Sequence, residues 1–250
     1  MFGGGNGNDP YTKDGGTTWV DNPGANIGNT TTPGNATTLL TGGYVHEAYG
    51  GSNKRGTVFG NVSIDMGAGS VSENTNGACT LDVEKLVGAG KDADVNGDLI
   101  MVMGCKPDAK TPVLYAGADN ANVNGDVELT ITSGKFGKVF GGNNEGGIIM
   151  GHIILNIEET GECDVPIEID ELYLGGNEAA YSMYGYYKDG DTYKPRTAEM
   201  AAITDPSATG YTPSLTSADF GGTEIRKTAP YDAPVLNVVS CTYIDRKSVV

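Results

Sequence analysis

Aromatic side chains gather in two polar, glycine-rich stretches of the sequence, and these rings are the side chains best suited to contact a ligand. The first stretch, about residues 6–38, holds Trp19, the single tryptophan of the chain. The second, about residues 177–234, is rich in tyrosine: Tyr181, Tyr184, Tyr186, Tyr187 and Tyr193. Exposed rings on loops can stack on sugar rings or anchor a protein partner. The alternative is that the rings pack onto the body of the protein and fix the loops in place.

Catalytic chemistry has little support in the sequence. His46 and His152 occupy alternating positions of strand-like stretches, so we expect both on a solvent-exposed face. No nucleophile elbow, zinc-protease motif or P-loop is present. Asp98 and Asp126 stand at equivalent positions of a repeat, where acids more often form a solvated row than a catalytic pair. We therefore predict no catalytic residue.

The sequence also gives no convincing metal site. Gly4-Gly5-Asn6-Gly7-Asn8-Asp9 fits a calcium-binding motif that acts through consecutive copies. It occurs once and its related turns lack the aspartate, so we interpret the match as chance, and a real calcium ion would lie near Asp9. We predict no cofactor and no metal ligand.

The four cysteines do not resemble a zinc site. Cys79, Cys105, Cys163 and Cys241 form no Cys-x-x-Cys pair. Three of them, Cys79, Cys163 and Cys241, fall near equivalent places of the repeat, so a disulfide stays open beside the simpler expectation of buried free thiols.

A repeated phrase predicts how these side chains are positioned. An apolar or aromatic residue is followed by small residues, usually glycines, and often by Asn, Asp or Ser. The copies begin at Phe2, Tyr49, Val87, Tyr115, Phe140 and Tyr173. Asn and Asp after glycine suit a turn conformation, and repetition of this kind decides the architecture of a chain.

A second phrase follows four of these turns and predicts strands. Its pattern is apolar, any residue, Gly, any residue, and then apolar residues at alternate positions. It occurs as residues 58–66, 95–103, 123–131 and 149–157. A period of two buries one face of a strand and leaves the other wet, and the glycine marks a corner or a close backbone approach.

Together the phrases predict an all-β chain, namely a single-stranded right-handed parallel β-helix (a β-solenoid) with two long loop insertions, about residues 6–38 and 177–234. Repeats then stack in register, with Val62, Leu99, Val127 and Ile153 above one another. The right hand follows from the bias of parallel crossovers. An antiparallel sandwich with glycine-rich hairpins is the alternative. One short helix is expected at residues 197–202, inside a loop.

Composition restricts the partners. The chain has 250 residues, 39 of them glycine, with 16 Lys plus Arg against 32 Asp plus Glu and a net charge of −16. Such a surface repels nucleic acid and anionic lipid. No apolar run is long enough to insert into a membrane. Residues 1–250 form one repeat segment, and because both ends cut through a repeat we expect a longer parent protein that carries any export signal.

The phrases around Phe140-Gly141-Gly142-Asn143 and residues 123–131 resemble those of very large β-repeat surface proteins of anaerobic gut bacteria. The resemblance covers residues 39–176 and neither insertion. It implies export, a cell-surface or extracellular location and an adhesin-like role. We therefore expect a non-catalytic structural or adhesive segment that binds glycan or a host or cell-surface protein through its aromatic loops. The alternatives are a carbohydrate-active enzyme, either a polysaccharide lyase or a glycoside hydrolase, with a cleft between the two insertions, and a trimeric fibre.

Overall fold

The structure is a computed structural model of the chain. It describes residues 1–7, 11–12, 15, 19–20, 25–67, 81–104, 110–159, 166–216, 219, 233–239 and 243–248, and for residues 11–12, 19–20 and 243–248 it describes the backbone. Strands dominate, and one short helix is present in this part of the chain, α1 (Ala198–Ala202). The expectation of a chain with almost no helix is confirmed. The short helix predicted at residues 197–202 is also confirmed, with Thr197 as the N-cap of α1.

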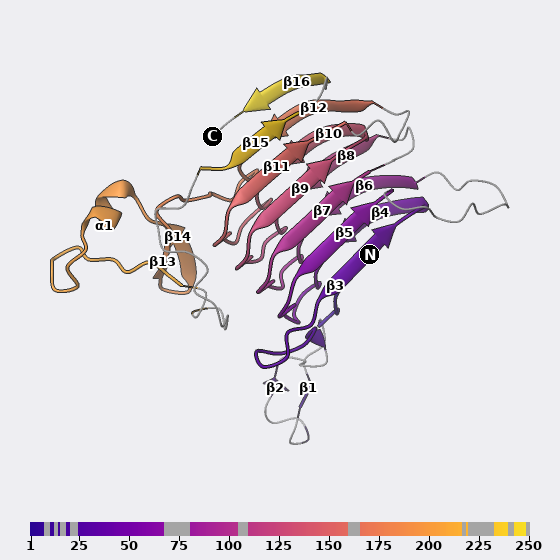
Figure 1. The fold of residues 1–250 in the computed structure, drawn as a ribbon. Helices are drawn as coiled ribbons and strands as arrows, with labels where there is room; N and C mark the ends of the chain where they lie inside the picture. Colours follow the sequence, from indigo (N-terminus) through magenta and orange to yellow (C-terminus); the bar gives the residue numbers. More distant parts are fainter. Residues whose placement is uncertain are drawn as a thin grey trace.

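Two parallel sheets of six strands each form the body of the molecule (Figure 1). The first sheet has the order β16-β12-β10-β8-β6-β4, with β4 (Gly43–Tyr49), β6 (Leu81–Val87), β8 (Thr111–Tyr115), β10 (Gly134–Phe140), β12 (Ile167–Tyr173) and β16 (Tyr243–Ser248). The second has the order β15-β11-β9-β7-β5-β3, with β3 (Ala36–Leu40), β5 (Val62–Met66), β7 (Leu99–Met103), β9 (Val127–Ile131), β11 (Ile153–Ile157) and β15 (Val235–Val238). We call this body the parallel stack.

Four short strands lie outside the parallel stack as antiparallel pairs. β1 (Tyr11–Thr12) pairs with β2 (Trp19–Val20), and β13 (Tyr186–Asp189) pairs with β14 (Thr192–Pro195). These hairpins fall within the two predicted insertions. The first insertion joins the stack before its predicted end, since Ala36 already pairs with Val62.

The predicted single-stranded right-handed parallel β-helix is wrong. The chain forms two distinct parallel sheets, and successive strands of the repeat alternate between them. Two antiparallel hairpins, β1–β2 and β13–β14, lie outside both sheets. The physical reason is that each repeat holds two separate apolar alternations divided by a glycine turn. Each alternation therefore buries its own face and adds to its own sheet.

The register prediction is confirmed. Val62 is opposite Leu99, Leu99 is opposite Val127, and Val127 is opposite Ile153, all in parallel strands. All four side chains are buried. Equivalent apolar residues therefore form columns that run across the strands, and these columns make up the core between the sheets.

Asparagine and aspartate side chains link the glycine corners from one repeat to the next. The backbone N–H of Asp98 donates to Asn61 Oδ1 at 3.0 Å, that of Asp126 to Asp98 Oδ1 at 2.9 Å, and that of His152 to Asp126 Oδ1 at 2.7 Å. The two aspartates predicted to form a row thus accept backbone donors that the sheets do not pair. Their role here is to hold the corners together.

Thr111 offers a test of the core. Its side chain is fully buried on β8, opposite Phe136, and its hydroxyl oxygen has no hydrogen-bond partner among the described residues. We expect Thr111→Val to raise the free energy of unfolding by about 1 kcal/mol, because the substitution removes an unsatisfied buried polar group at nearly constant volume. Chemical denaturation measures the change. Thr132→Val is the matched control and should lower stability, since the Thr132 hydroxyl donates to Met103 O at 3.2 Å. A loss of stability in Thr111→Val would contradict the expectation.

Candidate functional site

The segment between β12 and β15 extends away from the parallel stack and contains a hairpin and a helix of its own (Figure 1). Its described part, residues 177–216, contains the β13–β14 hairpin and α1, and Figure 1 shows these elements extending to one side of the stack. We call residues 177–216 the projecting segment. It carries all five tyrosines predicted from the sequence to contact a ligand.

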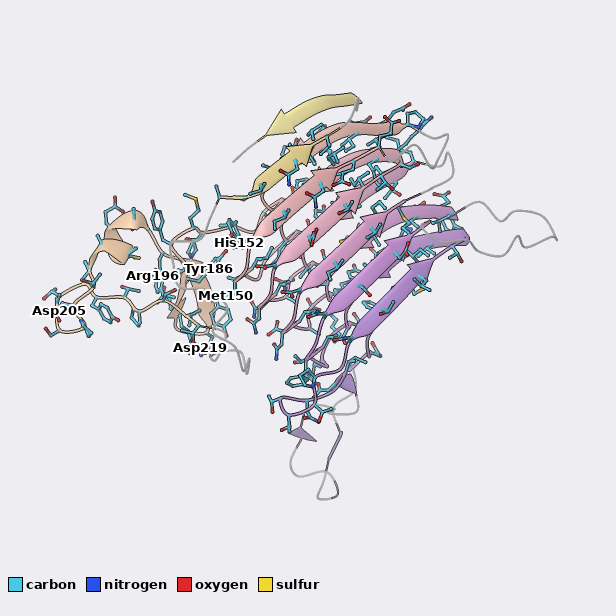
Figure 2. The ribbon with its side chains drawn as sticks, in the orientation of Figure 1. Met150, His152, Tyr186, Arg196, Asp205 and Asp219 are labelled. Carbon is cyan, nitrogen blue, oxygen red and sulfur yellow. The ribbon has the colours of Figure 1, made fainter. Side chains whose placement is uncertain are left out.

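Tyr186 fixes the projecting segment to the stack. Its side chain is fully buried and packs with Ile148 and Met150, which precede β11. Its hydroxyl donates to Ala180 O at 3.3 Å and accepts from the Ser182 N–H at 3.0 Å. Figure 2 shows Tyr186 and Met150 at this junction. The ring therefore has an anchoring role in this structure, and none of it is presented to solvent.

Two further tyrosines face the stack. Tyr181 packs against the main core, and its hydroxyl donates to Gly151 O at 2.9 Å. Tyr193 and Leu215 pack against the cluster that contains Tyr186. These rings also hold the base of the segment, as in the alternative interpretation of the sequence.

Arg196 organises the base of the projecting segment from inside. Its side chain is nearly buried, and its guanidinium donates to Tyr184 O and Met200 O, both at 3.2 Å. The Ser182 hydroxyl donates to Arg196 O at 3.0 Å. The arginine thereby ties α1 to the chain before the hairpin, and Figure 2 shows it within the segment.

Tyr184 and Tyr187 are the remaining predicted rings, and both are partly exposed. Tyr187 lies opposite Lys194 in the hairpin, whereas Lys188 lies opposite Tyr193. Since successive strand residues point to opposite faces, Tyr187 and Lys194 share the face that points away from Tyr193. Lys194 Nζ donates to Asp189 Oδ2 at 2.5 Å, and this hydrogen bond raises the pKa of Lys194.

The described strands of the two aromatic insertions lie apart (Figure 1). Strand β2, which contains Trp19, pairs with β1 near the β3 end of the stack, while β13 and β14 lie well to the side in Figure 1. The side chain of Trp19 lies outside the described residues. The cleft that the enzyme alternative requires between both insertions is not formed by these described strands.

A buried polar cluster, missed by sequence reasoning, lies at the glycine turns of the first sheet. Lys85 Nζ is 3.1 and 3.2 Å from the two carboxylate oxygens of Asp119, whose side chain is 6% exposed. Asp119 also accepts from Tyr49 OH at 3.1 Å and from Asn144 Nδ2 at 2.6 Å. The ammonium group lies 5.6 Å from the centroid of Tyr49 and 5.7 Å from that of Tyr115, within the range of cation–π attraction.

This cluster fills an interruption in a column of rings. The first residues of the repeated phrase stack along the sheet, with centroids 5.0 Å apart for Tyr115 and Phe140 and 4.8 Å for Phe140 and Tyr173. Val87 occupies the place of a ring between Tyr49 and Tyr115. Lys85 lies two residues before it and puts its charge between the flanking rings. The signal in the sequence was the single aliphatic residue at an otherwise aromatic position of the phrases between Tyr49 and Tyr173.

The electrostatics of the cluster favour a structural role. Burial would raise the pKa of Asp119, but hydrogen bonds from Asn144 and Lys85 and the positive charge of Lys85 outweigh burial and leave this pKa below its usual value. Burial, followed by the negative charges of Asp119 and Glu47, raises the pKa of Tyr49. The carboxylate therefore stays ionised and the phenol neutral at neutral pH, as a structural role requires.

The other predicted candidates are scattered. His46 is exposed on β4 beside Glu84, and His152 lies before β11, with Nδ1 3.6 Å from Asp126 Oδ1. Asp9 and all four cysteines lie outside the described residues. Within the ranges that the structure describes, no group of three or more His, Cys, Asp or Glu side chains could hold a metal ion, and no helix is long and apolar enough to cross a membrane.

Comparisons with known proteins found no relative. No protein-family model, curated protein or solved structure matches the chain.

Proposed function

We propose that the chain is a non-catalytic structural and adhesive segment of a bacterial protein exposed at the cell surface or secreted. The parallel stack serves as a rigid support, and the projecting segment makes the contact with the partner. The observation that carries the proposal is the different exposure of two neighbouring tyrosines. Tyr186 is buried and anchors the segment, while Tyr187 is partly exposed on the other face of the hairpin. The sequence resemblance to surface proteins of gut bacteria supports the location.

Residues 187–214, the outer part of the projecting segment, can be replaced while the residues that anchor the segment to the stack are kept. The Leu215 N–H donates to Tyr186 O at 2.8 Å, so the two ends of residues 187–214 lie side by side. A variant in which a short glycine-rich turn replaces these residues keeps Tyr186 and Leu215. Far-UV circular dichroism and a cooperative thermal transition would show that its stack is intact.

Binding to immobilised polysaccharides and to intact cell surfaces tests the proposal. We expect retention of the wild-type chain, loss of retention in the variant that lacks residues 187–214, and no release of sugar. Equal retention of both proteins would refute adhesion through this segment. New reducing ends or unsaturated products would instead support the carbohydrate-active enzyme.

A further inference from the structure

We propose that the ligand of the projecting segment is a neutral oligosaccharide, with one pyranose ring stacked on Tyr187 and its hydroxyl groups bound by the polar residues of the same hairpin. This inference rests on the proposed adhesive function and adds the chemical class of the partner. Three features of the hairpin carry it: the ordered backbone beneath the ring, the chemistry of the neighbouring side chains and the local charge.

The hairpin holds the backbone of Tyr187 in a defined place. The register from Tyr186 opposite Pro195 to Asp189 opposite Thr192 leaves only Gly190 and Asp191 in the turn. Gly190 has φ 61°, which suits the first central position of a tight two-residue turn. Tyr186 is buried at the base of the same strand. A ring on such a support loses little conformational entropy when a ligand stacks on it.

The residues around Tyr187 form hydrogen bonds and offer almost no apolar surface. On the Tyr187 face of the hairpin and in its turn, the exposed side chains that can donate or accept are Asp189, Asp191, Thr192 and Lys194. Lys188 lies on the opposite face. A protein–protein interface has an apolar centre within its polar rim, and one ring does not provide it. A pyranose needs one aromatic face for its C–H groups and several polar partners for its hydroxyls.

Charge selects a neutral ligand over an acidic one. The whole chain carries −16, which disfavours a polyanion at every approach. On the Tyr187 face Lys194 is already paired with Asp189, and Asp191 in the turn adds a negative charge. The field beside Tyr187 therefore does not attract an anion, while a carboxylate and an ammonium side by side can bind uncharged hydroxyl groups.

Affinity electrophoresis in gels that contain single polysaccharides tests the inference. The probes are neutral glucan, mannan and xylan, with polygalacturonate as the acidic probe. We expect at least one neutral polysaccharide to retard the wild-type chain, and Tyr187→Ala to weaken that binding about tenfold, the equivalent of about 1.4 kcal/mol. Tyr187→Phe should retain most of the affinity because the stacking face remains. Tyr44→Ala is the matched control, since Tyr44 is 64% exposed but lies on β4 of the stack, and it should bind like the wild type.

The outcomes separate this inference from the proposed function. Retardation by polygalacturonate alone, or protein binding that Tyr187→Ala abolishes, would overturn the ligand class and leave adhesion by the segment standing. Equal retardation of the wild type and Tyr187→Ala by a neutral polysaccharide would overturn the role of Tyr187. If the variant lacking residues 187–214 also behaved as the wild type in every assay, the proposed function would fail with it. Absence of retardation by every neutral probe would overturn the inference.

Discussion

Alanine at Gly125 is expected to destabilise the protein by about 3 kcal/mol or more. A Cβ atom at this position would lie 2.3 Å from Gly97 O and 2.4 Å from Gly97 C, both backbone atoms of the preceding repeat. It would also meet Asp98 Oδ1 at 2.4 Å, the oxygen that accepts the Asp126 N–H. Since the backbone cannot rotate away as a side chain can, the repeats would have to separate, and overpacking of this kind is costly. Denaturant unfolding measures the loss.

Gly190→Ala is the control for this substitution. Gly190 has a positive φ, as Gly125 does not, but a Cβ atom there would meet no atom within 4 Å. Gly190→Ala should lower the free energy of unfolding by about 1 kcal/mol, because only the positive φ disfavours alanine at this position. Equal losses in Gly125→Ala and Gly190→Ala would mean that close packing of the corners contributes little to stability.

Removal of the Asp119 carboxylate is expected to cost about 3 kcal/mol at neutral pH. Asp119→Ala leaves the Lys85 ammonium group between Tyr49 and Tyr115 without its counter-charge, and it takes an acceptor from Asn144. Breaking one partner of a largely buried ion pair is costly because the remaining charge is uncompensated. Lys85→Met combined with Asp119→Ala should recover part of the loss, because that charge is then absent. If Asp119→Ala costs the same with Lys85 and with Met at position 85, the ion pair makes no contribution.

The pH dependence provides a second readout of the same substitution. The pKa of Asp119 is lower in the folded chain than the usual value of about 3.9. The carboxylate therefore contributes its full stability above that usual value, and the contribution disappears as the pH falls through the lower folded pKa. The difference in unfolding free energy between the wild type and Asp119→Ala should be constant near neutrality and should shrink in strong acid. A difference that grows in acid would contradict the assignment.

The sequence predicts the repeating part of this fold well because its signals are local and periodic. The alternation at Val127, Leu129 and Ile131 identifies a strand, and the same alternation at Ile153, Leu155 and Ile157 identifies its parallel partner. The division into two sheets was missed because the period-two pattern says which side chains are buried and does not say which strand receives the next hydrogen bonds.

The candidate site was predicted only in part. The high tyrosine content of residues 177–234 identified the projecting segment. It could not show that Tyr186 is buried and Tyr187 is partly exposed, because neighbouring residues of a strand point to opposite faces. The pair Gly190-Asp191 is a hairpin signal, because glycine suits the first central position of a two-residue turn. It places Tyr186 and Tyr187 on opposite faces but does not say which of the two faces is buried. The Lys85–Asp119 pair could not be predicted from the sequence for another reason. The two residues lie in different repeats, 34 residues apart, and only the stacking of the repeats in register brings them together.

The columns of equivalent residues have a consequence for how such a protein can change its length. The inner strands of the stack contact equivalent strands on both sides, so β9 meets β7 and β11 in the same register. Deletion of one whole repeat would place neighbours together whose surfaces already match, and duplication would extend the body by one spacing of about 4.8 Å. The reach of the projecting segment can therefore evolve in whole steps by recombination within a gene, without any redesign of the packed interior.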